Sequence, residues 1–138
     1  GVLGGLVGIT AGADQMSPLE SVIIGAIGGI VVVLAISFMD KQKLDDPVGA
    51  IAVHLFGGIW GTLAVGIFGD LASGEQFAVQ AACVGITGVF SVVSCTIIGF
   101  ITSAIFGGMR VSKEEEIAGL DGAEHGMSAY ADFRLNQH

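Results

Sequence analysis

Three long stretches of the chain carry no formally charged side chain, and they constrain its fold more than any other feature. They are Ser21–Met39, Pro47–Gly69 and Gln76–Met109. The apolar core of a bilayer is about 30 Å thick, and a helix needs about 20 residues to cross it. A chain of 138 residues has too little exterior to cover three helices that are apolar on every side. We therefore predict an all-α fold, a polytopic transmembrane helical bundle.

Composition agrees with this interpretation. Charged residues make up 13% of the chain and the mean hydropathy is +0.80, whereas soluble domains carry about 25% charged residues. The chain has no basic patch, so we expect no nucleic-acid partner. No cluster of residues predicts an enzyme, a metal site or a cofactor. Cys83 and Cys95 lie about 18 Å apart along one helix, too far for a disulfide.

Capping signals divide the chain into elements. Ser17-Pro18-Leu19-Glu20 is a capping box with proline at the first helical position, Asp46-Pro47 resembles another helix start, and Ser73 precedes the third span. We predict transmembrane helices at residues 18–39, 46–69 and 75–107. The last exceeds the thickness of the bilayer, so it must tilt, bend or protrude. Residues 1–13 are too short to cross, and we expect them to be the end of a truncated transmembrane helix in a fragment that lacks its N-terminal part.

The positions of lysine and arginine predict the orientation. Lys41 and Lys43 follow the first full span, and Arg110 and Lys113 follow the last, whereas the loops on the other side contain neither residue type. The positive-inside rule places both groups in the cytoplasm, so residues 108–138 are predicted to be a cytoplasmic tail. Within it, a capping box begins at Ser112 and Gly119 is a helix stop. We expect one short acidic helix followed by irregular structure.

Glycines recur at four-residue spacing within the apolar stretches, as in Gly4/Gly8/Gly12, Gly25/Gly29 and Gly57/Gly61. This small-xxx-small spacing lets helix backbones approach closely. Trp60 lies near the middle of its span, so we expect it to pack in the core rather than at the membrane interface.

His54 is the only acid or base side chain within the three full spans. It lies about 10 Å inside the boundary set by Pro47, and an ionisable residue at that depth marks a functional site by default. Ala50, Gly58, Gly61 and Val65 are expected on the same helical face, and the small residues among them leave room beside the ring. Apolar surroundings disfavour imidazolium, so we expect a neutral ring with one donor and one acceptor. It could contact a small polar solute or pass a proton; the alternative is a histidine hydrogen-bonded between helices.

Several segments carry a resemblance to a known family. The run from Asp45 to His54, followed by Gly58-Ile59-Trp60-Gly61-Thr62-Leu63, resembles the penultimate transmembrane helix of the Amt ammonium transporters. Leu6–Gly12 is similar to the end of an earlier helix of that family. The run Gly108–Asp121, with His125-Gly126 and Ala129-Tyr130, resembles its cytoplasmic C-terminus. The resemblance extends to about Phe133.

The resemblance implies a function for the spans. Amt proteins bind and deprotonate ammonium near the outer mouth, and a narrow apolar pore with two hydrogen-bonded histidines carries ammonia and the proton. His54 matches the second of these histidines, and Ala50 matches a pore-lining position. The first histidine and the outer recognition site lie on helices absent from this chain. The fragment alone is therefore not expected to conduct.

The resemblance also implies partners. Amt proteins are homotrimers in the lipid bilayer of the cell membrane (plasma or inner), and their tail couples neighbouring subunits. In many prokaryotes a PII-type signal protein binds at the cytoplasmic face. The matching tail positions here are Arg110, Glu114, Glu116, Gly119, Leu120, Asp121, His125 and Gly126.

Two alternatives stay open. One is an Amt-like sensor module that binds ammonium and signals through an attached domain. The other is an Rh-type ammonia channel, which shares the pore histidines but usually lacks the acidic tail motif.

Overall fold

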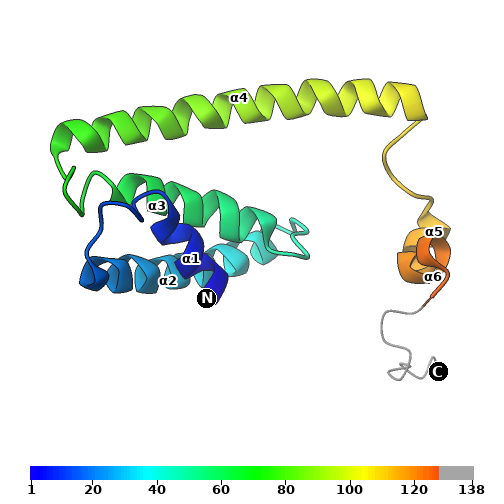
Figure 1. Cartoon of the computed structure of the whole chain (residues 1–138). Coiled ribbons are helices and arrows are strands. Elements are labelled where there is room, and N and C mark those ends of the chain that lie inside the picture. Colours follow the sequence, from blue (N-terminus) through cyan, green and yellow to red (C-terminus); the bar gives the residue numbers. More distant parts are fainter. Residues whose placement is uncertain (128–138) are drawn as a thin grey trace. The chain divides into compact units, whose positions relative to one another are not determined.

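The computed structural model describes residues 1–127, which form helices and connecting loops without a strand in that range (Figure 1). The prediction of an all-α chain is confirmed. The chain divides into two compact units, Gly1–Val92 and Val93–His138, and each is described by itself. The end of the predicted tail, residues 128–138, lies outside the described residues, and with it Ala129 and Tyr130 of the resemblance.

The first unit contains helix α1 (Val2–Thr10), helix α2 (Pro18–Lys41), the π-helix η1 (Ala50–Phe56), helix α3 (Gly57–Ala64) and the greater part of helix α4 (Gly74–Phe106). Helix α4 continues into the second unit. Helices α2 and α4 are long and apolar enough to cross a membrane, and η1 with α3 forms a shorter apolar helix. Figure 1 shows α1, α2 and α3 packed side by side.

Glycine backbones form the contacts between these three helices. A β-carbon built on Gly61 of α3 would lie 2.5 Å from the carbonyl oxygen of Gly8 in α1. One built on Gly28 of α2 would lie 2.7 Å from the carbonyl oxygen of Gly4. Real β-carbons do not come this close to backbone oxygens, so the two approaches need glycine. The predicted close approach of helices is therefore present at Gly4, Gly8 and Gly61, and Gly28 adds a contact that was not among the predicted ones.

The buried side chains lie among the same helices. They are Ile24, Val32, Ala35 and Met39 of α2, Ala52 and Val53 of η1, Ala64 of α3, and Val65 just after it. The remaining large apolar side chains of α2 are mostly exposed, and none of the residues of α4 is buried. Helices with apolar outer faces are typical of a chain surrounded by lipid or by further apolar helices.

Hydrogen bonds join the loops at one end of the first unit. The capping box predicted at Ser17 and Glu20 is present, and Glu20 has a second role that its sequence did not predict. Its Oε1 accepts a hydrogen bond from the backbone N–H of Gly69, at 3.0 Å. The side-chain oxygen of Gln15 similarly accepts from the backbone N–H of Leu71, at 3.2 Å. The start of α2 is thereby attached to the loop after α3.

The second predicted span differs from its expected bounds. Helical structure begins at Ala50 rather than at residue 46 and ends at Ala64, before the expected residue 69. Its first part is a π-helix, which nothing in the sequence predicted. After Ala64 the backbone N–H groups of Gly66 and Ile67 bond to carbonyls three residues back, and Gly69 has a φ of 78° in the turn that leads to α4. Helix α4 begins beside Ser73, whose hydroxyl accepts the backbone N–H of Gln76 at 3.0 Å.

The described part of the second unit adds helices α5 (Lys113–Ala118) and α6 (Leu120–His125). The capping box at Ser112 is confirmed, and α5 ends before Gly119, which has a φ of 94°. The expectation of irregular structure after that glycine was wrong. Gly119 redirects the chain instead of ending all helical structure, and Leu120 begins a second helix. This helix ends at Gly126, which has a φ of 65°.

The contact at Gly61 leads to a prediction about stability. We expect Gly61→Ala to lower the free energy of unfolding by about 1–3 kcal/mol, because the added methyl group must push α1 and α3 apart. This loss outweighs the gain of about 1 kcal/mol that alanine brings to a helix. Thermal unfolding of the purified protein in detergent measures it. Gly58→Ala is the control, because no described atom lies within 4 Å of its β-carbon position; an equal loss in both variants would contradict the expectation.

Candidate functional site

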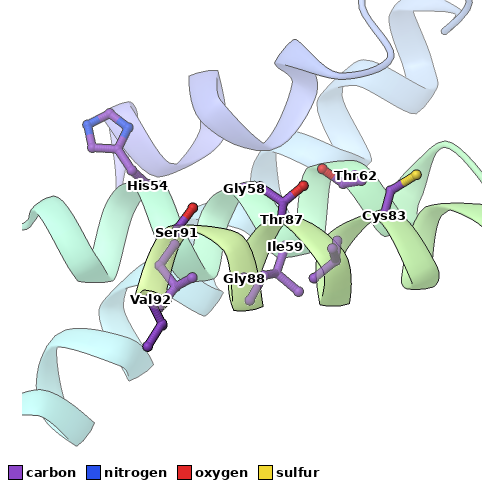
Figure 2. Close-up of a pocket in the computed structure, with 11 residues that line it drawn as sticks. His54, Gly58, Ile59, Thr62, Cys83, Thr87, Gly88, Ser91 and Val92 are labelled. Atoms are coloured by element: carbon purple, nitrogen blue, oxygen red, sulfur yellow. The ribbon is translucent and has the colours of Figure 1, made fainter. Parts of the chain in front are cut away.

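A cavity of about 390 Å³ lies in the first unit, between the η1–α3 segment and α4 (Figure 2). Its polar lining consists of His54, Thr62, Cys83, Thr87 and Ser91. The rest of the lining is glycine, valine, leucine and isoleucine. The cavity is therefore an apolar groove with a small number of donors and acceptors, which is the usual character of a site for small molecules.

The polar residues form one stripe on each wall. His54, Gly58 and Thr62 follow one another at four-residue spacing, and so do Cys83, Thr87 and Ser91. Residues four apart on a helix share a face. Figure 2 shows His54 at one end of the groove and Thr62 with Cys83 at the other. The groove therefore carries an imidazole near one end and hydroxyl groups along its length.

The π-helix that carries His54 is capped from the preceding turn. Asp46 Oδ2 accepts the backbone N–H of Ala52 at 2.9 Å, and Oδ1 accepts that of Ile51 at 3.1 Å. Helix starts leave such N–H groups without partners inside the helix. Gly49, with a φ of 69°, makes the turn that brings the carboxylate back over the helix start. From the sequence, Asp46 was expected to cap a helix that begins at the next residue. In the structure it caps backbone N–H groups five and six residues later, those of Ile51 and Ala52.

These hydrogen bonds lower the pKa of the Asp46 carboxyl group, and the bond from Ala52 is the largest cause. The ionised form accepts both bonds, so the folded chain favours it over the protonated form. Asp46 lies in the loop before the helix, outside the apolar segment. Its charge also lies at a helix N-terminus, where the partial positive charge of the backbone favours an anion.

The opposite face of the helix holds it against α1 and α2. Val53 and Gly57 are buried, and a β-carbon on Gly57 would lie 3.5 Å from a side-chain methyl of Val7 and 3.6 Å from one of Val32. With this face fixed, the side chain of His54 is exposed, and His54 is one of the residues that line the groove. The local sequence thus determines two faces, one that packs and one that stays open.

The structure brings together only some of the predicted site residues. Gly58 lines the groove beside His54, as expected. Gly61 and Val65 were expected on the same face, but Gly61 is buried against Gly8 and Val65 is buried as well, so that expectation was wrong for both. Ala50 is the exposed first residue of η1 and is not part of the groove lining.

Sequence reasoning missed the contribution of α4. Two of its hydroxyl residues, Thr87 and Ser91, line the groove together with Cys83. A signal was present, because polar side chains repeat there at four-residue spacing within an otherwise apolar helix. That spacing shows a shared face but cannot show which element the face meets.

In the second unit, Arg110 and Glu116 form an ion pair. Arg110 Nη2 lies 2.9 Å from Glu116 Oε1, and the two side chains are 81% and 51% exposed. The hydrogen bond to Glu116 raises the pKa of the Arg110 guanidinium. Exposed pairs of this kind contribute little to stability, typically about 0–1 kcal/mol. The pair therefore orients the start of the tail more than it stabilises the tail.

The other predicted tail residues lie on or beside the two short helices. Glu114 is in the first turn of α5, Gly119 separates α5 from α6, and Leu120, Asp121 and His125 belong to α6, which Gly126 follows. The hydrogen bonds of the capping box lower the pKa of a further carboxyl group, that of Glu115, with the bond from the Ser112 side chain as the largest cause. A compact, acidic pair of helices therefore follows Arg110.

Comparison with known proteins identifies the family. The sequence matches the model of the ammonium transporter family over residues 1–130. The chain belongs to the ammonium transporter family. The resemblance inferred from the spans and the tail is thereby confirmed, and a helical membrane protein is the architecture that follows.

Curated relatives come from distant organisms. Ammonium transporter Amt2 of Methanocaldococcus jannaschii is 39% identical over 136 residues, which cover 96% of this chain and 32% of that protein. Ammonium transporter Amt2 of Archaeoglobus fulgidus is 40% identical over 149 residues, with 96% and 32% covered. Ammonium transporter 3 of Dictyostelium discoideum is 33% identical over 147 residues, with 94% and 34% covered. The chain thus spans about a third of the length of these relatives.

The hydrogen bonds of Asp46 lead to a prediction about pH. Because its pKa is lowered in the folded chain, its contribution to stability is present above the unfolded value of about 3.9 and is lost as the pH falls through the folded value. We expect Asp46→Asn to lower the thermal unfolding midpoint at about pH 7, and the difference from the unchanged protein to shrink toward about pH 3. Unfolding followed by circular dichroism measures both.

The matched control for this test is Asp45→Asn. It removes a neighbouring carboxylate for which the described residues show no hydrogen bond to a helix start. Equal effects of the two substitutions would mean that the loss of charge matters and the cap does not.

Proposed function

We propose that the full-length protein carries ammonium or ammonia across the cell membrane, and that this chain supplies its C-terminal helices and tail. Membership of the ammonium transporter family supports the substrate. The observation that carries the proposal is the position of His54, an exposed imidazole on an apolar helix beside a groove. A proton-transfer group in such surroundings has a use only if a small polar solute or a proton can reach it.

His54 acts on the solute through its two ring nitrogens. A neutral imidazole has one N–H donor and one lone pair, so it can donate to one molecule while it accepts from another. Ammonia offers the same combination, whereas a permanent cation at this position would repel ammonium. We propose that Ala50, the exposed first residue of η1, lines the pathway beyond the groove itself, where its small side chain does not obstruct it.

The proposed orientation follows from charge. Lys41 and Lys43 lie near one end of the first unit, and the hydrogen-bonded loops of Gln15 and Glu20 lie at the other end. The positive-inside rule assigns the lysine end and the tail to the cytoplasm. The protein is then a multi-pass protein of the plasma or inner membrane.

The tail acts between subunits. We propose that the transporter is a homotrimer in which the tail from Arg110 onward contacts the neighbouring subunit and couples the pores. The compact helices α5 and α6 and the ion pair of Arg110 with Glu116 support a specific contact surface. The cytoplasmic face is also the proposed position of a PII-type signal protein.

His54→Ala tests the pathway. We expect the substitution to lower methylammonium uptake by the full-length transporter by about tenfold or more, which is the order of loss when a proton-transfer group is removed. Radiolabelled uptake in cells that lack other ammonium transporters measures it, normalised to the amount of protein in the membrane. Gln42→Ala, in the loop after α2, is the control. Uptake by His54→Ala at the unchanged rate and with the unchanged pH dependence would refute the role.

A truncation tests the tail. We expect removal of every residue from Arg110 onward to reduce uptake while the oligomer seen by gel filtration stays intact. Arg110→Ala alone should have a smaller effect, because its exposed ion pair is weak. Full uptake by the truncated protein would argue against coupling through the tail, and dissociation of the oligomer would assign the tail to assembly instead.

A further inference from the structure

Trp60 makes a hydrogen bond across the bundle. Its indole Nε1–H donates to the backbone carbonyl of Ile24 at 3.0 Å, which joins α3 to α2. Ile24 is fully buried. Tryptophan N–H groups usually find a partner when they are buried, and here the partner lies on another helix. The bond therefore connects two apolar helices at a defined point.

Glycines make room for the indole. A β-carbon on Gly8 of α1 would lie 3.3 Å from Trp60 Cδ1, and one on Gly28 of α2 would lie 3.5 Å from the same atom. The indole thus rests against both helices where neither has a side chain. Its place along the axis is defined by shape as well as by the hydrogen bond. The next carbonyl on the same face of α2 is one turn away, about 5.4 Å, which the same indole cannot reach without a slip of the whole helix.

The same helix carries His54. Helix α3 follows η1 without a break, and Trp60 lies six residues after His54. Sliding or rotation of α3 against α2 would therefore move the imidazole along or out of the groove. Gly57, between the two, contacts Val7 and Val32 but has no side chain that could resist such a movement.

We propose that Trp60 is a positioning residue for His54. Its indole sets the register of α3 against α2, and this register sets the depth and direction of the imidazole in the groove. The transport consequence rests on the proposed function of His54, whereas the register itself can be measured without transport.

Cross-linking measures the register. In the full-length protein with Cys83 and Cys95 replaced by alanine, the pair Val32→Cys and Gly57→Cys brings two thiols together, because a β-carbon at Gly57 lies 3.6 Å from the Val32 side chain. Trp60→Phe keeps an aromatic ring and removes the N–H. We expect it to slow oxidative cross-linking about threefold, because the free energy of an average interhelical hydrogen bond in a membrane corresponds to a factor of about three. Phe100→Leu is the control, since that ring is 73% exposed. An unchanged rate in Trp60→Phe would overturn the proposal.

A double-mutant cycle measures the effect on transport. We expect Trp60→Phe to reduce the maximal rate of methylammonium uptake when His54 is present, with no further reduction in the His54→Ala background. Equal reductions in both backgrounds would show a merely structural role and overturn the proposal. If His54→Ala alone leaves uptake unchanged, the proposed function fails, and the cross-linking result still decides whether Trp60 sets the register.

A milder variant covers the case in which Trp60→Phe does not assemble. Gly8→Ala places a methyl group 3.3 Å from the indole and leaves the indole itself intact. We expect it to slow the same cross-link and to couple to His54 in the same direction. A normal cross-linking rate in assembled Gly8→Ala protein would also count against the proposal.

Discussion

Direct contact between glycine backbones holds the helices of the first unit together, and the other features of that unit depend on it. In a membrane the surroundings are as apolar as the side chains, so helices gain little from the hydrophobic effect when they associate. Close packing must supply the attraction, and the approach of Gly61 to Gly8 brings α1 and α3 into backbone contact. This contact buries one face of the η1–α3 segment, while His54 on η1 stays exposed and lines the groove.

Polar groups then define positions that apolar packing leaves free. At one end, Glu20 and Gln15 attach the start of α2 to the loop after α3. At the other end, Asp46 holds the first turns of the π-helix. In the apolar middle, Trp60 connects α3 to α2. Glu20, Gln15 and Asp46 satisfy backbone N–H groups that have no partner within a helix, whereas at Trp60 the backbone carbonyl of Ile24 satisfies the N–H of the indole.

The π-helix is a local departure from α-helical geometry, and it contains His54, the proposed pathway residue. π-Helical segments are rare in proteins as a whole, and those that occur are often found at functional sites. Here the wider turn lies beneath His54 and is held from Asp46, in a loop outside the apolar segment. The helix that carries His54 is thus bonded to a carboxylate six residues before Ala52 in the sequence and, through Trp60, to a carbonyl 36 residues away.

The sequence by itself determined which segments are apolar, where α2 and α5 begin, and which family the chain belongs to. These conclusions hold because charge segregation is a property of composition, and because a capping box involves groups only three residues apart. Tertiary structure alone decided the π-helical winding at His54, the side of the helix to which Gly61 belongs, and the acceptor of the Trp60 N–H. It also brought Thr87 and Ser91 of α4 to the groove. Each of these features depends on which distant segment packs against the helix. Periodicity in the sequence shows which residues share a face of one helix, but it does not show which segment contacts that face.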